Sequence, residues 1–265
     1  MNPVILPVFQ RAIHLGPLVI HFYALAYIIA LLIGWRLVLN LVARDPLAAT
    51  PAQVDDFLTW ATLGIILGGR IGYVLFYQPV FFYHHPARVF AVWDGGMSFH
   101  GGFLGVTIAI LWFCRRQNMN PFRFADRIAV AVPIGLFLGR CANFINGELW
   151  GRPAPAWFPL AMVYPAAGPL PRYPSELIEA CLEGVLLFII LFTAVQSDKI
   201  RRRTGTLTGI FVLGYGIARI IGECFREPDW FLGFLPFGTT MGQVLSIPMV
   251  IGGSIILWFA WRQKV

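Results

Sequence analysis

The sequence predicts an all-α, polytopic membrane protein with seven transmembrane helices and a small irregular head on the outer face. The first observation is composition: of 265 residues, 58% are hydrophobic, only 12% are charged, and the mean hydropathy is +0.71. A soluble domain carries about twice that share of charged residues. The other two observations are the long apolar runs and the uneven distribution of basic residues between them. We expect a single integral membrane domain over residues 1–265.

Seven apolar runs are each long enough to cross the hydrocarbon core of a bilayer. They are Leu18–Leu39, Phe57–Tyr77, Gly96–Cys114, Phe124–Cys141, Ser175–Gln196, Leu207–Glu223 and Thr240–Trp261. The first run does not resemble a cleavable signal peptide, because no basic region precedes it and its apolar stretch is too long. We therefore expect it to remain as a span.

Basic residues predict the orientation. Eleven arginines and lysines lie in or next to the connections after odd-numbered spans and the C-terminus, against five on the opposite side and four in the spans. Cytoplasmic connections of membrane proteins carry the excess of basic residues. The N-terminus is thus expected to be periplasmic and the C-terminus cytoplasmic. The net charge of +7 then reflects cytoplasmic connections and does not indicate nucleic-acid binding.

One connection is long. Ala142–Pro174 contains seven prolines together with Trp150 and Trp157. It has too many prolines for a helix and too much apolar surface for a flexible linker. We expect residues 142–174 to form an irregular periplasmic head over the outer leaflet.

The strongest functional signal closes the fourth span. After an apolar stretch come Arg140, Asn143, Asn146 and Glu148, and the segment ends at Gly151. Ionisable groups at this depth are costly unless they face a cavity or a partner. Arg140 and Asn143 are three residues apart and share a helical face, and a guanidinium suits a phosphate. The alternative is an arginine that reaches the headgroups beside an Asn-Gly helix end, but the whole cluster favours a functional site.

The sixth span carries a polar stripe. Tyr215, Arg219, Glu223 and Arg226 follow one another at steps of four, four and three, so they lie on one side of an otherwise apolar helix. Such a stripe faces the protein interior in a membrane. Its alternative role is an ion pair that holds the helices together.

A glycine-rich stretch, residues 93–102, precedes the third span and contains His100. Glycines permit tight backbone, and a neutral histidine accepts a proton near pH 7. An interfacial histidine at a helix entry is an equally good interpretation of this segment. Tyr23, at the start of the first span, has the position of an interfacial aromatic residue.

The second span has glycines at every fourth position, Gly64, Gly68 and Gly72. Small residues at this spacing allow close helix packing in membranes. The neighbouring Arg70 needs an internal partner, for which the candidates are Glu148, Glu176 and Glu223.

Three segments together resemble the prolipoprotein diacylglyceryl transferases of the bacterial inner membrane: residues 94–102, residues 139–151 and the stripe from Tyr215 to Glu223. The resemblance extends over essentially the whole chain and includes Gly68–Tyr73 and Met241–Pro248. It implies transfer of the diacylglyceryl group of phosphatidylglycerol to the lipobox cysteine of a preprolipoprotein, with release of glycerol phosphate. Implied catalytic residues are His100, Tyr215, Arg140 and Arg219. Implied substrate-binding residues are Tyr23, Asn143, Asn146, Glu148, Gly151 and Glu223, and we expect Arg70 to bind substrate as well.

The residue chemistry is compatible with this activity. Breaking a glycerol C–O bond to phosphate requires stabilisation of the leaving phosphate, which Arg140 and Arg219 could supply. A thiol has a reference pKa of about 8.5, so a base increases its thiolate fraction. His100 is the best candidate base, with Tyr215 as its partner or alternate. Glu148 and Glu223 are expected to orient the arginines.

Other classes fit less well. An anion transporter needs a polar path to both sides, and the cytoplasmic halves of the spans are apolar. An intramembrane serine protease would need a glycine after Ser98, where Phe99 stands. A metal-dependent phosphatidyltransferase would need an aspartate cluster, for which Asp94 is the lone candidate. The four cysteines show no metal-ligand spacing and look like apolar core residues. We expect no metal and no soluble cofactor, with membrane lipids and the lipobox peptide as partners.

Overall fold

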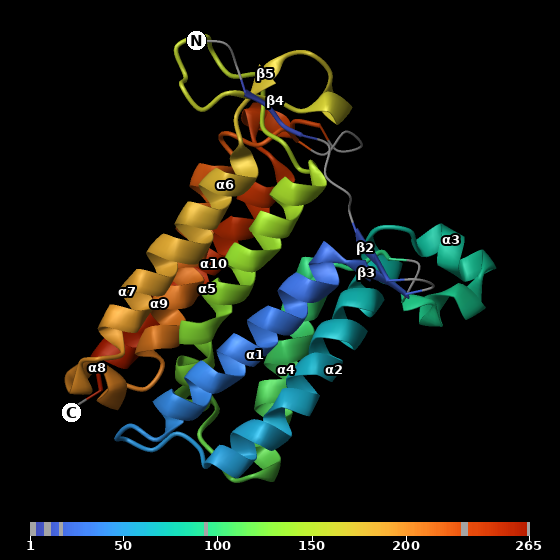
Figure 1. The fold of residues 1–265 in the computed structure, drawn as a ribbon. Coiled ribbons are helices and arrows are strands. Elements are labelled where there is room, and N and C mark those ends of the chain that lie inside the picture. The colour runs from blue at the N-terminus through green and yellow to red at the C-terminus, as the bar shows by residue number, and fades with distance from the viewer. Residues whose placement is uncertain (1–3, 8–11, 16–17, 93–94, 229–232, 264–265) are drawn as a thin grey trace. The chain divides into compact units, whose positions relative to one another are not determined.

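The structure is a computed structural model that describes residues 4–7, 12–15, 18–92, 95–228 and 233–263. It is mostly helical (Figure 1). The chain divides into two compact units. The first, here called the α5–α10 unit, comprises residues 1–37 and 126–265, and the second, the α2–α4 unit, comprises residues 38–125.

Among the described residues, five helices are long and apolar enough to span a membrane. They are α1 (Phe22–Val42), α2 (Pro51–Phe76), α5 (Pro121–Asn146), the continuous helix Ser175–Ala194 and α10 (Met241–Trp261). The other two predicted spans correspond to α4 (Phe99–Arg116) and α9 (Thr206–Gly222), and α9 is apolar but has only 17 residues. The chain is therefore a polytopic helical membrane protein, and the number of seven spans stays a prediction.

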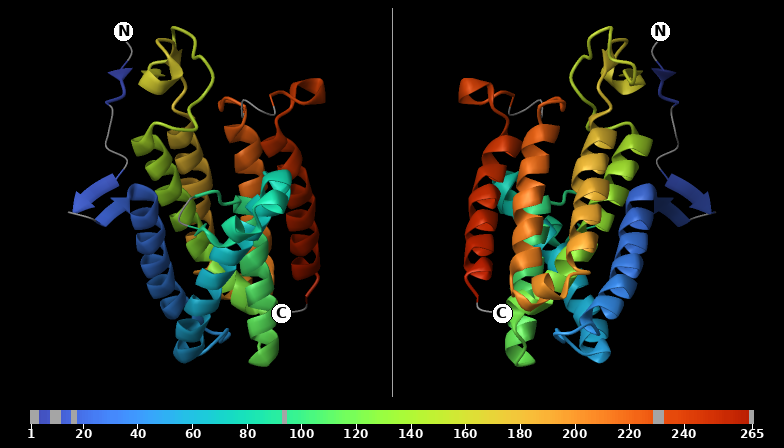
Figure 2. Two further views of the ribbon diagram at one scale, coloured as in Figure 1. Left: turned by 90° about the vertical axis from the view of Figure 1, so that its right-hand side faces the viewer. Right: turned by 90° about the vertical axis from the view of Figure 1, so that its left-hand side faces the viewer.

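The α5–α10 unit is a bundle in which α5, α7 (Leu187–Ala194), α9 and α10 run side by side (Figures 1 and 2). Asp126, buried near the start of α5, ties that helix to the start of α9. Its two carboxylate oxygens accept hydrogen bonds from the backbone N–H groups of Gly205 and Thr208 and from the Thr208 hydroxyl, each at 2.7 Å. A carboxylate is favourable at a helix N-terminus because it satisfies unpaired N–H groups. The short helix α8 (Asp198–Arg202) precedes this junction.

Two small sheets correct the prediction of an all-α fold. In the described part of the chain, β1 (Val4–Ile5), β4 (Met162–Val163) and β5 (Pro171–Arg172) form one sheet in the order β1-β4-β5. β2 (Ala12–Leu15) and β3 (Leu18–His21) form an antiparallel hairpin before α1. β1 pairs with a segment more than 150 residues away, and two-residue strands leave no periodic pattern in a sequence.

The predicted head begins later than expected, because α5 continues to Asn146. The remainder, up to Pro174, has only the short strands β4 and β5 and a 3₁₀ turn, η3 (Pro165–Ala167), as predicted for a proline-rich segment. Tyr164, fully buried, joins the head to the next helix by donating a 3.0 Å hydrogen bond to Glu176. Burial and then the neighbouring Glu176 carboxylate raise the pKa of Tyr164, so its hydroxyl stays protonated and remains a donor.

The α2–α4 unit confirms the glycine pattern. α2 begins at a capping box. The Thr50 hydroxyl accepts from the Gln53 N–H at 3.2 Å, and the Gln53 side-chain oxygen accepts from the Thr50 N–H at 2.9 Å. A Cβ at Gly64 would lie 2.8 Å from the Gly105 carbonyl oxygen of α4, and one at Gly72 would lie 2.8 Å from the Gly101 Cα. The glycines therefore let two helix backbones touch. α3 (Pro79–His84) and the 3₁₀ helix η1 (Pro86–Phe90) follow α2.

The cysteine prediction was wrong for two of four residues. Cys114 is buried, but Cys181 and Cys224 are exposed on the surface of the α5–α10 unit. A thiol behaves as a small hydrophobe, so an apolar surrounding such as a bilayer suits it as well as a core does.

Candidate active site

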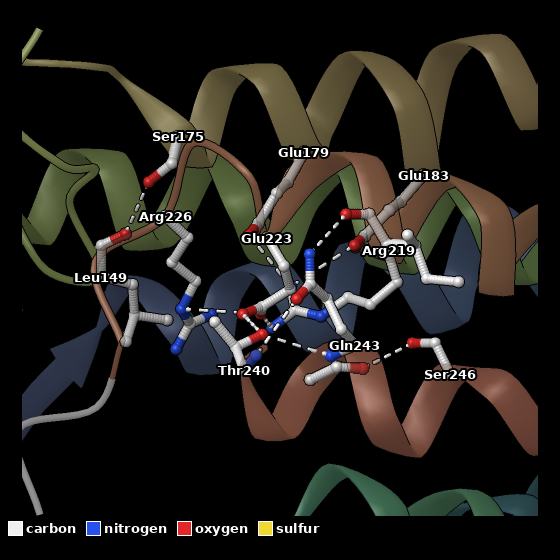
Figure 3. Close-up of polar contacts among 12 residues, drawn as sticks. Leu149, Ser175, Glu179, Glu183, Arg219, Glu223, Arg226, Thr240, Gln243 and Ser246 are labelled. Carbon is white, nitrogen blue, oxygen red and sulfur yellow. Dashed lines mark hydrogen bonds and ion pairs between the residues drawn. The ribbon is translucent and has the colours of Figure 1, made fainter. Parts of the chain in front are cut away.

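The centre of the α5–α10 unit is a buried cluster of arginines and glutamates. The Arg140 guanidinium on α5 lies 2.8 Å from Glu179 and 3.1 Å from Glu183. Arg219 on α9 lies 3.0 Å from Glu179 and 3.4 Å from Glu183. Each carboxylate thus bridges both arginines (Figure 3 shows the Arg219 side of this cluster). Buried charges are tolerated only when paired in this way.

Helix register explains why the two arginines meet. Asp126 ties the start of α5 to the start of α9, and Arg140 lies 14 residues after it on α5. Arg219 lies 11 residues after Thr208 on α9. At a rise of about 1.5 Å per residue, both guanidiniums stand roughly 16–21 Å from the shared anchor. The sequence prediction that Arg140 and Arg219 come together from two helices is confirmed.

The glutamates come from an irregular helix that the sequence prediction missed. Glu179 ends α6 (Ser175–Glu179), and Glu183 lies in a π-helical segment, η4 (Ala180–Leu186). π segments widen a helix locally and are frequent at functional sites. A Cβ at Gly184 would lie 2.6 Å from the Phe137 Cβ, so only glycine lets this segment approach α5 so closely. Three acids at steps of three and four in an apolar run were the available signal.

Glu223 extends the cluster. Its carboxylate pairs with Arg219 one turn before it, accepts a 2.7 Å hydrogen bond from the Thr240 hydroxyl, and lies 4.0 Å from the Arg226 Nε (Figure 3). A Cβ at Gly242 would lie 2.5 Å from the Glu223 carboxyl carbon, so glycine makes room for it. Glu223 and Arg219 thus pair along the same stripe, and the orienting role of Glu223 stays a prediction. Tyr215, the first residue of that stripe, is buried as well.

The end of α5 holds a second polar group. The Asn143 side-chain amide donates to the Tyr23 hydroxyl of α1, so Tyr23 is more than an interfacial aromatic residue. The Asn146 amide donates a 2.7 Å hydrogen bond to Glu148. The carboxylates that contact Arg140 are therefore Glu179 and Glu183, whereas Glu148, which was expected to orient an arginine, bonds Asn146.

Gly151 lies where three backbone segments converge. Its N–H donates to the Tyr173 carbonyl at 3.0 Å, and its carbonyl accepts from Arg172 at 3.0 Å. A Cβ at this position would lie 2.7 Å from the Phe225 carbonyl oxygen. Any other residue would separate the end of α9 from the head. Glycine is therefore required at position 151 for packing, whether or not it contacts substrate.

The predicted carboxylate partner of Arg70 was wrong. Its guanidinium is buried in the α2–α4 unit and donates to backbone carbonyls of Val89 at 2.9 Å, Arg88 at 2.6 Å and Gly96 at 3.2 Å, and also to Gly95. Five N–H donors in a fixed fork can gather several carbonyls at once. Arg70 therefore fastens the loop before α4. Trp93 and Asp94, in the same predicted glycine-rich segment, lie outside the described residues.

His100 is the second residue of α4. Ser98 caps this helix: its hydroxyl accepts from the Gly101 N–H at 3.2 Å, and its own N–H donates to the Gly69 carbonyl at 2.9 Å. The His100 side chain is exposed in its unit, and its ring meets Phe99 edge-on at 5.8 Å. His100 belongs to the α2–α4 unit and the arginines to the α5–α10 unit, so its role beside them stays a prediction.

A polytopic helical protein with a buried, ion-paired arginine–glutamate centre belongs to the class of integral membrane proteins with a polar site among their helices. The family model for prolipoprotein diacylglyceryl transferase matches residues 10–259. The chain therefore belongs to the prolipoprotein diacylglyceryl transferase family.

Three curated relatives illustrate the similarity, and each is called phosphatidylglycerol–prolipoprotein diacylglyceryl transferase. The protein of Acidiphilium cryptum is 65% identical over 249 residues, which cover 94% of this chain and 90% of the relative. That of Gluconacetobacter diazotrophicus is 62% identical, covering 91% and 86% respectively. That of Gluconobacter oxydans is 51% identical over 263 residues, covering 99% and 96%.

Proposed function

We propose that this chain transfers the diacylglyceryl group of phosphatidylglycerol to the lipobox cysteine thiol of a preprolipoprotein. The observation that carries the proposal is the match to relatives of that name over more than nine-tenths of the chain. The buried arginine pair supports it, because a membrane-embedded guanidinium pair suits the phosphate of a lipid.

The reaction joins the cysteine sulfur to a glycerol carbon. The thiolate attacks that carbon, the C–O bond to phosphate breaks, and the phosphate oxygen keeps the electron pair. The products are a thioether and glycerol phosphate, and the thiol proton passes to a base. We assign the base to His100, with Tyr215 as partner or alternate, because a positioned acceptor with a pKa near the working pH is the most efficient.

The remaining site residues have proposed supporting roles. Arg140 and Arg219 stabilise charge on the leaving phosphate oxygen, as preorganised donors do. Tyr23, Asn143, Asn146, Glu148, Gly151 and Glu223 of the α5–α10 unit contribute to binding phosphatidylglycerol and the lipobox peptide. Arg70 of the α2–α4 unit contributes through the loop before α4 that it fastens. The contact between Tyr23 and Asn143 supports a shared role for these two.

We propose seven spans in the bacterial inner membrane, with the N-terminus and the head at residues 142–174 in the periplasm and the C-terminus in the cytoplasm. The basic residues support this orientation. Ala166→Cys in the head and Arg202→Cys in α8 replace exposed residues. An impermeant thiol reagent should label the first from the periplasm and the second only after the membrane is opened. Labelling of Ala166→Cys from the cytoplasm alone would contradict the orientation.

The activity can be tested by measuring the mass of the acceptor peptide. Purified protein, phosphatidylglycerol and a lipobox peptide should yield a peptide heavier by one diacylglyceryl group. A peptide with serine in place of the lipobox cysteine is the control and should stay unmodified. An unmodified cysteine peptide in the presence of folded protein and phosphatidylglycerol would refute the proposed function.

A further inference from the structure

Two carboxylates at the centre of the site have no role in the proposed reaction so far. Glu179 and Glu183 are 1% and 0% exposed, yet each contacts both Arg140 and Arg219. One ion pair would be enough to join two helices. The doubled bridge instead fixes the position of both guanidiniums relative to each other.

We propose that Glu179 and Glu183 are positioning residues that aim the two arginines and also limit their hold on the phosphate product. This inference rests on the proposed function and adds to it a cause for product release. It follows from the donors that the carboxylates use and from the charge that they contribute.

The first step concerns donors. A guanidinium has five N–H groups. The bridging carboxylates engage Arg140 through Nε, Nη1 and Nη2. Arg219 uses Nη1 for Glu179 and Glu183, and Nη2 for Glu223. Glu183 accepts hydrogen bonds from Arg140 Nε and Nη2 and from Arg219 Nη1, whereas Glu179 contacts both arginines as an ion pair. The carboxylates thus occupy part of each five-donor fork and fix the direction of the whole guanidinium.

The second step concerns charge. The six ion-paired side chains of the cluster carry three positive and three negative charges: Arg140, Arg219 and Arg226, and Glu179, Glu183 and Glu223. Arg152 adjoins them and adds one positive charge, because its guanidinium donates to the neutral carbonyls of Glu223 and Arg226. With three of its four positive charges offset by carboxylates, the cluster holds an anion more through directed hydrogen bonds than through net charge.

The third step concerns what the reaction does to the phosphate. The lipid substrate is a phosphodiester with one negative charge. Once the C–O bond breaks, the product is a phosphomonoester, whose second ionisation has a pKa of about 6, so it carries close to two charges at pH 7. Arginines without acidic partners would bind this product more tightly than the substrate. The two glutamates offset that difference and favour release.

Glu183→Gln tests the inference. Glutamine keeps the size and one acceptor oxygen but removes the charge, so the cluster gains one positive charge. In a poorly hydrated site, one unit of charge within several ångströms changes anion affinity by about tenfold or more. We expect glycerol phosphate to inhibit the variant at concentrations at least about tenfold lower, and kcat to fall because release is slower. A helix-joining role alone would not tighten product binding.

Three variants serve as comparisons. Glu183→Asp keeps the charge, so glycerol phosphate should inhibit it at about the same concentration as the wild type. Its kcat can still fall, because the shorter side chain changes the direction of the two guanidiniums. Glu227→Gln removes a half-exposed carboxylate that pairs with the largely buried Arg172 at 3.2 Å, and it should leave product inhibition unchanged. Glu179→Gln should reproduce the Glu183→Gln effect, because the two carboxylates have the same pair of partners.

Binding of glycerol phosphate to detergent-purified protein, measured by calorimetry, gives a readout that does not need turnover. It separates this inference from the proposed function, whose failure would appear as a wild-type protein without transfer activity. Unchanged glycerol phosphate affinity in folded Glu183→Gln and Glu179→Gln proteins would overturn the inference. Failure of both variants to fold would also overturn it, since that result assigns the acids to helix assembly.

Discussion

Gly64→Ala should separate α2 from α4. The added Cβ would lie 2.8 Å from the Gly105 carbonyl oxygen, 2.9 Å from its carbonyl carbon and 3.1 Å from the Val106 nitrogen. All three are backbone atoms, which cannot rotate away as a side chain could. Ordinary contact begins near 3.4 Å, so the helices must part by about half an ångström along a tightly packed seam.

Two opposing effects set the magnitude. Overpacking of this kind costs about 1–3 kcal/mol, and alanine regains up to about 1 kcal/mol through its better helix propensity. We expect a net loss of about 1–2 kcal/mol in the free energy of unfolding. Gly252→Ala in α10 is the matched control, because a Cβ there meets nothing within 4 Å. It should be neutral or slightly stabilising.

The assay is equilibrium unfolding of the purified protein in mixed micelles, followed by helical circular dichroism as the denaturing detergent increases. The two alanine variants should differ by about 1–3 kcal/mol, which is the strain at Gly64 alone, because both variants gain the same helix propensity. Equal stability of Gly64→Ala and Gly252→Ala would refute the close-contact reasoning. It would mean that the α2–α4 seam has room for a methyl group.

Three further variants test individual side chains. His100→Ala should lower transfer by about 10²–10⁴-fold while phosphatidylglycerol binding persists, as expected on removal of a general base; near-normal turnover would move the base role to Tyr215. Arg219→Lys should stay folded but lose transfer activity, because an ammonium cannot reproduce the directed donors of a guanidinium. Arg202→Lys, at a half-exposed position of α8, is the control and should behave as wild type. Full activity of Arg219→Lys would mean that the cluster is only an ion pair for helix assembly. Arg70→Lys cannot bond four carbonyls at once, so thermal unfolding should show a loss of about 1–3 kcal/mol, and an unchanged midpoint would mean that the loop before α4 is held by other contacts.

Composition and periodicity were enough to predict the class of protein and most of its helices. Apolar runs and sparse charge are local properties, so five spans could be recognised with boundaries that shifted by only a few residues. The glycine stripe at Gly64, Gly68 and Gly72 could be predicted equally well, since residues four apart lie on one face of a helix. The polar stripe from Tyr215 to Glu223 was recognised for the same reason.

The pairing of charges could not be predicted, because it depends on how the helices pack. Along the sequence Glu148 is the acidic residue nearest to Arg140, but α5 ends between them at Asn146, and Glu148 bonds Asn146. Glu183 is 43 residues away from Arg140 along the chain, and it meets that arginine because η4 widens the helix and Gly184 lets it approach α5. Arg70 bonds backbone carbonyls rather than a carboxylate, and no pattern of side chains in the sequence predicts a bond to backbone. Ion pairs depend on distances of a few ångströms between helices, and helical periodicity gives the face of each helix but not its neighbour or its height along that neighbour.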